Sequence, residues 1–122
     1  APVAEKIQAL KTLHEAGLRT AIMAAPLLPG ISDWRAIVEQ TRPYTDRYGF
    51  DSLNMRPAYQ RKVMDFVELH YPQALKLMSK IYVEEDRTYW KELGQEIRRY
   101  CSENNLPADI YFDTAAPFSG AQ

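Results

Sequence analysis

The sequence predicts an α/β fold that is rich in helices and contains about three parallel strands within one domain of 122 residues. The main observation is Thr20–Ala25, a short and almost wholly apolar run that is typical of a parallel strand buried on both faces. Pro26 is expected to end this strand, and Ser32 or Asp33 can cap the helix that follows. A helical segment precedes the run, so the local order is helix, strand, loop, helix.

Two amphipathic helices flank this first strand. The earlier one is expected over Val3–Ala16, and Gly17 is expected to end it. Pro43 is expected to end or kink the later one, because proline has no backbone N–H to donate. Apolar residues recur at helical spacing in both, at Val3, Ile7, Leu10 and Leu13 and again at Trp34, Ile37, Val38 and Thr41.

Asp51–Arg56 predicts the second strand, and Pro57 is expected to end it. Because Asn54 and Arg56 fall at its carboxyl end, they are expected at the edge of the sheet where α/β proteins bind ligands. A second interpretation is equally compatible with the sequence. In that interpretation Arg56 pairs with a surface acid and Asn54 hydrogen-bonds the backbone of a loop.

The remainder of the sequence is mainly helical. One helix is expected over Tyr59–His70, and Pro72 can open the next at its first position. Asp86 is a good N-cap for a third helix over Arg87–Asn104. Ile110–Phe112 then predicts a short third strand.

Composition and motifs exclude several classes of function. The net charge of −1 argues against a protein that binds nucleic acid mainly by electrostatics. There is no apolar run of about 18 residues that could span a membrane. Cys101 is the only cysteine and cannot form an internal disulfide, so a reducing cytoplasm is expected.

No self-contained catalytic group is recognisable. The sequence has no phosphate-binding loop, no HExxH motif, no paired CxxC motif and no GxSxG turn. We therefore expect neither a catalytic residue nor a metal site within the chain. The first residues lack an initiator Met and have no apolar leader, so the sequence is expected to be a cut from inside a longer protein.

A family resemblance extends over residues 1–33. This stretch resembles the middle of radical S-adenosylmethionine (radical SAM) enzymes, especially the group similar to spore photoproduct lyase and often described as DNA repair photolyase. The family pattern is AP, a helix ending in AG-[IL], an apolar strand, and then P-[IL]-[IL]-P-G with an acid. The residues that match it are Ala1, Pro2, Lys6, Ala9, Leu10, Leu13, Ala16, Gly17, Leu18, Pro26, Leu27, Leu28, Pro29, Gly30 and Asp33.

The resemblance implies the C-terminal part of a partial (β/α) TIM-type barrel. Residues 1–57 would form βα units, and residues 58–122 a helical extension with a final short strand and a frayed tail over Thr114–Gln122. Such enzymes hold a [4Fe–4S] cluster and S-adenosylmethionine at the barrel mouth, cleave the cofactor reductively and abstract hydrogen from a substrate. A CxxxCxxC loop ligates the cluster through thiolates. This chain lacks that loop, so it is expected to bind neither group and to be inactive alone, and its partner would be the missing N-terminal half.

The resemblance also implies site residues. The loop after the first strand and the end of the second would line the cofactor, although Pro26 departs from the commoner glycine-first form of that loop. Two residues just past the second strand, one aromatic and one basic, would face the substrate, which is a nucleic acid, a peptide or a small molecule in different members. The expected cofactor-binding residues are Leu27, Leu28, Asn54, Met55 and Arg56, and the expected substrate-binding residues are Tyr59 and Arg61.

Two hypotheses of different classes remain open. Either the chain is the C-terminal fragment of a radical SAM enzyme, or it is a free-standing α/β module that binds a ligand or partner without redox chemistry. Three strands cannot close into a barrel, so under the first hypothesis the isolated chain is expected to form homo-oligomers or exchange strands to cover its open edges.

Overall fold

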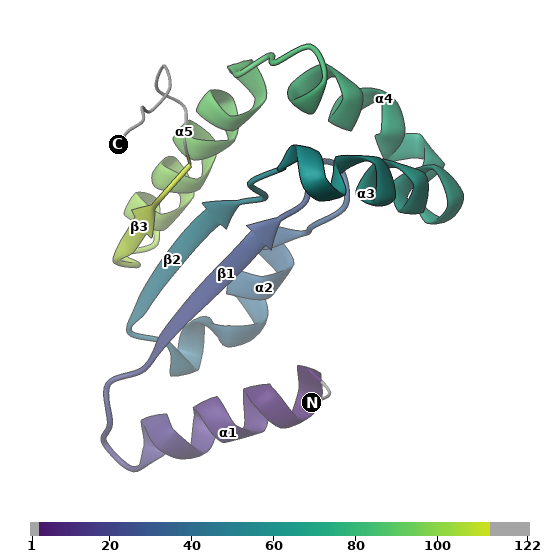
Figure 1. Ribbon diagram of the computed structural model, residues 1–122. Helices are drawn as coiled ribbons and strands as arrows, with labels where there is room; N and C mark the ends of the chain where they lie inside the picture. The colour runs from purple at the N-terminus through teal and green to yellow at the C-terminus, as the bar shows by residue number, and fades with distance from the viewer. Residues whose placement is uncertain (1–2, 113–122) are drawn as a thin grey trace.

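The computed structural model describes residues 3–112 and has five α-helices, one short 3₁₀ helix and one three-stranded sheet within them (Figure 1). The sheet is not closed into a barrel. In chain order the elements are α1 (Val3–Glu15), β1 (Ala21–Leu27), α2 (Trp34–Thr41), the 3₁₀ helix η1 (Arg42–Tyr44), β2 (Arg47–Ser52), α3 (Pro57–His70), α4 (Pro72–Tyr82), α5 (Thr88–Glu103) and β3 (Ala108–Ile110).

The sheet has the order β1-β2-β3, and both pairs of neighbouring strands are parallel. Met23 of β1 lies opposite Gly49 of β2, and Gly49 lies opposite Asp109 of β3. Strands that are consecutive in the sequence are therefore neighbours in the sheet, and helices lie in the connections between them. The predicted α/β class with three parallel strands is confirmed.

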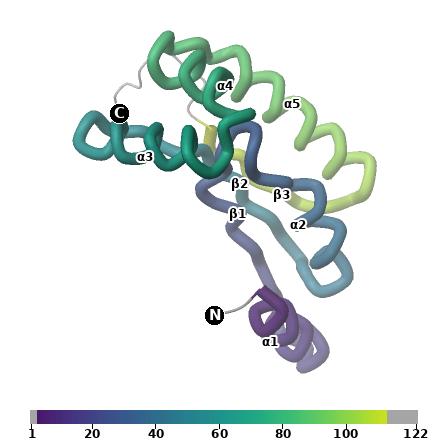
Figure 2. The backbone as a smooth tube through the Cα atoms, turned by 90° about the vertical axis from the view of Figure 1, so that its right-hand side faces the viewer, coloured from purple at the N-terminus to yellow at the C-terminus, as the bar shows by residue number. Residues whose placement is uncertain are grey.

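Helices α2 and α5 cover one face of the sheet (Figures 1 and 2). Tyr48 and Phe50 of β2 point into this layer and are at most 1% exposed, and their rings stack with centroids 6.0 Å apart. The Tyr48 hydroxyl is satisfied by the Thr41 hydroxyl at 2.7 Å, as a buried polar group must be. The buried core here consists of Ala24, Leu27, Trp34, Val38, Tyr48, Phe50, Ile81, Trp90, Ile97 and Cys101.

The opposite face of the sheet is not covered by any of the described helices. Met23 on this face is 58% exposed, so the expectation that the first strand is buried on both faces is wrong for this chain. Arg47 and Asp109 pair across β2 and β3 through two hydrogen bonds of 2.8 and 3.0 Å. A Cβ at Gly49 would lie 2.8 Å from the terminal methyl of Met23, so a larger residue there requires this flexible side chain to move.

The first strand runs past the position where it was expected to stop. Pro26 lies inside β1, which ends at Leu27, and the pairing with β2 shifts register between Ala24 and Leu27. Proline is tolerated because β1 is an edge strand among the described residues and the irregularity needs no N–H from Pro26.

The other two strands lie earlier in the sequence than expected. The second was expected at Asp51–Arg56 but forms at Arg47–Ser52, so Asn54 and Arg56 lie in the loop beyond it. Gly49 lies inside this strand, between the buried residues Tyr48 and Phe50. The third strand is Ala108–Ile110 rather than Ile110–Phe112, because the ladder to β2 begins directly after Pro107.

Helices α3 and α4 lie across the carboxyl ends of the strands as a helical pair (Figure 2). Val67, Ala74 and Met78 form their own small core. Pro72 opens α4 as predicted, while Pro57 begins α3 instead of only ending a strand. By contrast, α1 has no buried residue, and Val3 on its apolar face is 68% exposed.

The expected tail over Thr114–Gln122 lies outside the described residues. Among the helices of residues 3–112, none has the length and apolar character required to cross a lipid bilayer.

The contact between α5 and the sheet is expected to dominate stability. Ile97 is completely buried in this layer, so Ile97→Ala should lower the free energy of unfolding by about 2–4 kcal/mol through lost burial and a residual cavity. Leu69→Ala is the matched control, because Leu69 is 75% exposed and should change stability by less than about 0.5 kcal/mol. Urea unfolding measures both, and equal effects would contradict the assigned core.

Candidate functional site

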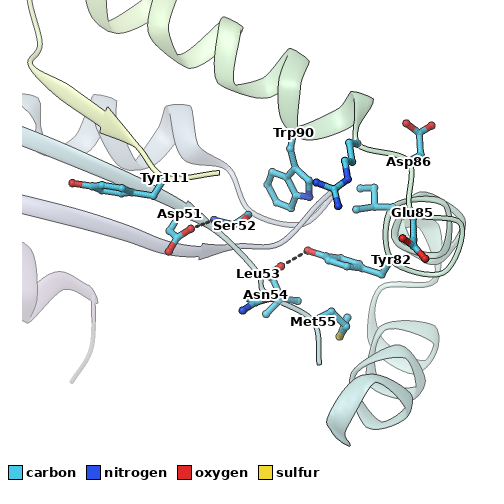
Figure 3. A pocket seen from close by; sticks show the side chains of 12 residues that line it. Asp51, Ser52, Leu53, Asn54, Met55, Tyr82, Glu85, Asp86, Trp90 and Tyr111 are labelled. Carbon is cyan, nitrogen blue, oxygen red and sulfur yellow. Dashed lines mark hydrogen bonds between the residues drawn. The ribbon is translucent and has the colours of Figure 1, made fainter. Parts of the chain in front are cut away.

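A cavity of about 520 Å³ opens at the carboxyl ends of β2 and β3 (Figure 3). Its volume lies within the range of small-molecule sites, and the carboxyl end of parallel strands is where α/β proteins bind ligands. Three loops meet there: the one after β2, the one between α4 and α5, and the segment after β3. The lining residues are Asp51, Ser52, Leu53, Asn54, Met55, Ile81, Tyr82, Glu85, Asp86, Arg87, Trp90 and Tyr111.

The sheet contributes an acid and an aromatic ring to the cavity. Asp51 is the penultimate residue of β2, and its Oδ1 accepts a hydrogen bond from the Ser52 N–H at 2.8 Å. The N–H of Tyr111 donates to the Phe50 carbonyl at 2.8 Å, which holds the segment after β3 alongside β2. The Tyr111 ring lies beside Asp51 and is 54% exposed (Figure 3).

Tyr82 fixes the end of α4 to the loop after β2. Its hydroxyl donates to the Leu53 carbonyl at 2.8 Å, and burial raises the pKa of Tyr82 well above its usual value. The phenol therefore stays protonated at neutral pH and keeps donating to Leu53. Its oxygen can still accept a hydrogen bond from a ligand.

The loop between α4 and α5 carries two further acids. Glu85 adopts a left-handed backbone conformation with φ of 57°, which is uncommon for a residue with a side chain. Asp86 accepts a hydrogen bond from the Thr88 N–H at 2.9 Å and pairs with Lys80 at 3.5 Å. The hydrogen bond from Thr88 is the main cause that lowers the pKa of Asp86.

The predicted cofactor-binding residues are only partly brought together. Asn54 and Met55 line the cavity, whereas Arg56 does not, and Arg56 makes no ion pair with any described residue. Leu27 is 3% exposed and packs into the core. Leu28 begins the turn after β1, where its N–H donates to the Ser32 hydroxyl at 2.8 Å. Contact of these residues with a cofactor stays a prediction.

The predicted substrate-binding residues lie on the first turns of α3. The Tyr59 hydroxyl donates to the Asn54 carbonyl, which ties α3 to the loop after β2. Arg61 is exposed. Neither residue lines the cavity, so a role in substrate binding also stays a prediction.

Sequence reasoning missed the residues that form most of the cavity wall. Asp51 was placed at the start of a strand, although it lies near the end of one. Neither the acids around Glu85 nor the rings of Tyr82 and Trp90 were among the expected site residues. Asp51 could have been predicted as a site residue only if the carboxyl end of β2 had been placed correctly. No local sequence pattern indicated that the loop of Glu85 lines the same cavity as Asp51.

The described residues do not provide a site for an iron–sulfur cluster. Such clusters need several thiolates, and Cys101 is 2% exposed on the core-facing side of α5, where burial raises the pKa of its thiol. No group of three metal-binding side chains occurs in residues 3–112.

One curated relative is similar over most of the chain. The uncharacterized protein MJ0683 of Methanocaldococcus jannaschii is 31% identical over 102 residues, which are 80% of this chain and 39% of that protein. The chain thus spans about two fifths of the length of this relative. No family model matches the chain, and no solved structure matches it.

Asp86 predicts a pH dependence of stability. Its pKa in the folded state lies below the ordinary aspartate value of 3.8, so its stabilising contribution is complete above about pH 4 and is lost as the pH falls through the lowered folded pKa. Asp86→Asn should therefore reduce the loss of stability on acidification below pH 4. Denaturant unfolding measured between pH 2 and pH 6 tests this, with Asp65→Asn on the exposed side of α3 as the control. Identical pH profiles for Asp86→Asn and the unmodified chain would contradict the assigned contact.

Proposed function

We propose that this chain is the C-terminal part of the barrel of a radical SAM enzyme similar to spore photoproduct lyase. The observation that carries the proposal is the one-sided sheet. Three parallel strands follow one another in sequence order, helices α2 and α5 lie on one face, and no element of residues 3–112 covers the other face or the outer edge of β1. This is the arrangement of a sector of a (β/α) barrel, in which the helices form the outer layer and the bare face points inward.

Two further observations support the proposal. The exposed apolar face of α1 is what a helix shows when the preceding barrel unit is not beside it. In addition, because the 102 matched residues are 39% of the Methanocaldococcus jannaschii relative, that protein is about 260 residues long, near the roughly 250 residues of a complete (β/α)₈ barrel.

Within such an enzyme, this chain would contribute the wall of the site and not the cluster. Bound S-adenosylmethionine and a [4Fe–4S] cluster would supply the radical that abstracts hydrogen from the substrate. The thiolates for the cluster would come from the N-terminal half, because Cys101 is buried away from the strand ends. Asn54, Met55 and Arg56 follow β2 at the edge where the cofactor would lie, and Leu28 follows β1 there. We place the protein in the cytoplasm, where Cys101 stays reduced.

The reading frame that encodes this chain tests the proposal directly. It is expected to contain a CxxxCxxC motif upstream of Ala1, and the full-length protein, reconstituted anaerobically, should show a broad iron–sulfur absorption band. The control is a variant with the three cysteines replaced by alanine, which should be colourless. A full-length protein that has no such motif and stays free of iron would rule the proposal out.

A free-standing binding module is the second candidate, and one observation favours it. The cavity of about 520 Å³ at the strand ends has the size of a site for a small ligand, and binding a ligand there requires no redox chemistry. The same reconstitution separates the two candidates, because the module would bind its ligand without iron.

The isolated chain is further proposed to self-associate through β1. The outer edge of β1 has no partner strand within residues 3–112, and Met23 adds an exposed apolar side chain beside it; such edges favour pairing between molecules. Light scattering is expected to show a dimer or larger species for this chain and a monomer for Met23→Lys. Leu69→Lys, which removes an even more exposed apolar residue on α3, should leave the association unchanged. A monomer at high concentration for the unmodified chain would contradict this proposal.

A further inference from the structure

The loop that joins β2 to α3 consists of residues 53–56 and belongs to no helix or strand. The Leu53 N–H donates to the Leu27 carbonyl at 3.2 Å, which extends the pairing of β2 with β1 by one hydrogen bond. Beyond that bond, the carbonyls of Leu53 and Asn54 accept hydrogen bonds from side chains and from no backbone group of the described residues. The conformation of the loop therefore depends on the groups that bind these two carbonyls.

Two tyrosine hydroxyls from different helices bind these consecutive carbonyls. Tyr82, the last residue of α4, donates to the Leu53 carbonyl at 2.8 Å (Figure 3). Tyr59, the third residue of α3, donates to the Asn54 carbonyl. Because hydrogen bonds to a carbonyl are directional, the two bonds together restrict the rotation of both peptide groups.

The two donors are held in place by the packing of their helices. Helices α3 and α4 pack on each other through the small core of Val67, Ala74 and Met78. The Tyr82 ring packs against this small core and also against the main one. The helical pair thus presents two fixed donors to carbonyls that have no backbone partner within residues 3–112.

The same loop carries three of the residues that the proposed function assigns to the cofactor. Asn54 and Met55 line the cavity, and Arg56 directly precedes α3. The bond from Tyr59 acts on the backbone of Asn54 itself, so its loss would release the chain from which these three side chains project. A loop that is ordered before its ligand arrives binds more tightly, because the ligand does not have to order it.

We propose that Tyr59 and Tyr82 are positioning residues whose hydroxyls hold the loop of residues 53–56 in the conformation that presents its side chains to the bound ligand. The inference deepens the proposed function, on which it rests for the identity of that ligand, S-adenosylmethionine. It gives Tyr59 a role that differs from the expected contact with the substrate, because its hydroxyl proton is already donated to Asn54.

The order of the loop is measured in the 122-residue chain with Tyr59→Phe and Tyr82→Phe, each of which removes one hydroxyl and keeps the ring. The readout is ¹⁵N relaxation of the amides of residues 54–56, whose order parameters are expected to fall from about 0.85 to below about 0.6. Tyr100→Phe is the matched control, because the Tyr100 ring packs on Trp34 in the layer of α2 and α5. This control should leave the loop unchanged.

Positioning is separated from a purely structural role by the dissociation constant for S-adenosylmethionine. It is measured by calorimetry with the full-length protein after anaerobic reconstitution. Tyr59→Phe should raise this constant about tenfold, as expected for the loss of one ordering hydrogen bond. Its melting temperature should stay within about 2 °C of the unmodified protein, because the bond from Tyr59 lies at the exposed surface.

The proposal is overturned if the loop stays ordered in both phenylalanine variants, or if Tyr59→Phe binds S-adenosylmethionine as tightly as the unmodified protein. An equal loss of affinity in Tyr100→Phe would also overturn it, because the effect would then not depend on the loop. If the unmodified full-length protein binds no S-adenosylmethionine, the proposed function fails, and the assignment of the ligand fails with it. The relaxation data on the 122-residue chain would still decide whether the two hydroxyls hold the loop.

Discussion

The structure depends on the burial of one face of β2 between α2 and α5. Tyr48 and Phe50 are almost completely buried there, and Trp34 meets Phe50 edge to face with ring centroids 6.2 Å apart. Burial of such large aromatic side chains is the dominant favourable contribution to folding in a domain of this size. Because all of that contact is on one face, the opposite face of the sheet gains no cover from the described residues.

The candidate cavity lies at the strand ends, where the sheet meets a pair of helices. Helices α3 and α4 pack on each other through Val67 and Met78 and lie across the strand ends. The hydrogen bond from Tyr82 to Leu53 fixes this helical pair to the loop after β2. The cavity therefore has walls from the sheet and from α4, and its carboxylates come from β2 and from the loop between α4 and α5.

Much of the fold could be predicted from the sequence, because it depends on local patterns. Helical periodicity gave the positions of all five helices to within a few residues, and the apolar run at residues 20–25 gave the first strand. The second strand was missed because its alternation is short and is interrupted by Gly49, a residue that normally signals a turn. Only the pairing with β1 and β3 makes that glycine part of a strand.

The candidate site was less predictable, since it depends on contacts between distant segments. Asn54 and Met55 were expected at the carboxyl end of the second strand, and both line the cavity although they lie in the loop beyond that strand. Glu85 and Asp51 are far apart in the sequence and share no motif, so nothing short of the tertiary structure places them on one cavity.

The position of Gly49 has a consequence for the bare face of the sheet. The terminal methyl of Met23 lies over the position that a Cβ of residue 49 would occupy. The height of this face above Gly49 is therefore set by the flexible, unbranched side chain of Met23. Since methionine changes rotamer at little energetic expense, the surface can be flat or ridged without any movement of the backbone, and it can conform to contacting groups of different thickness.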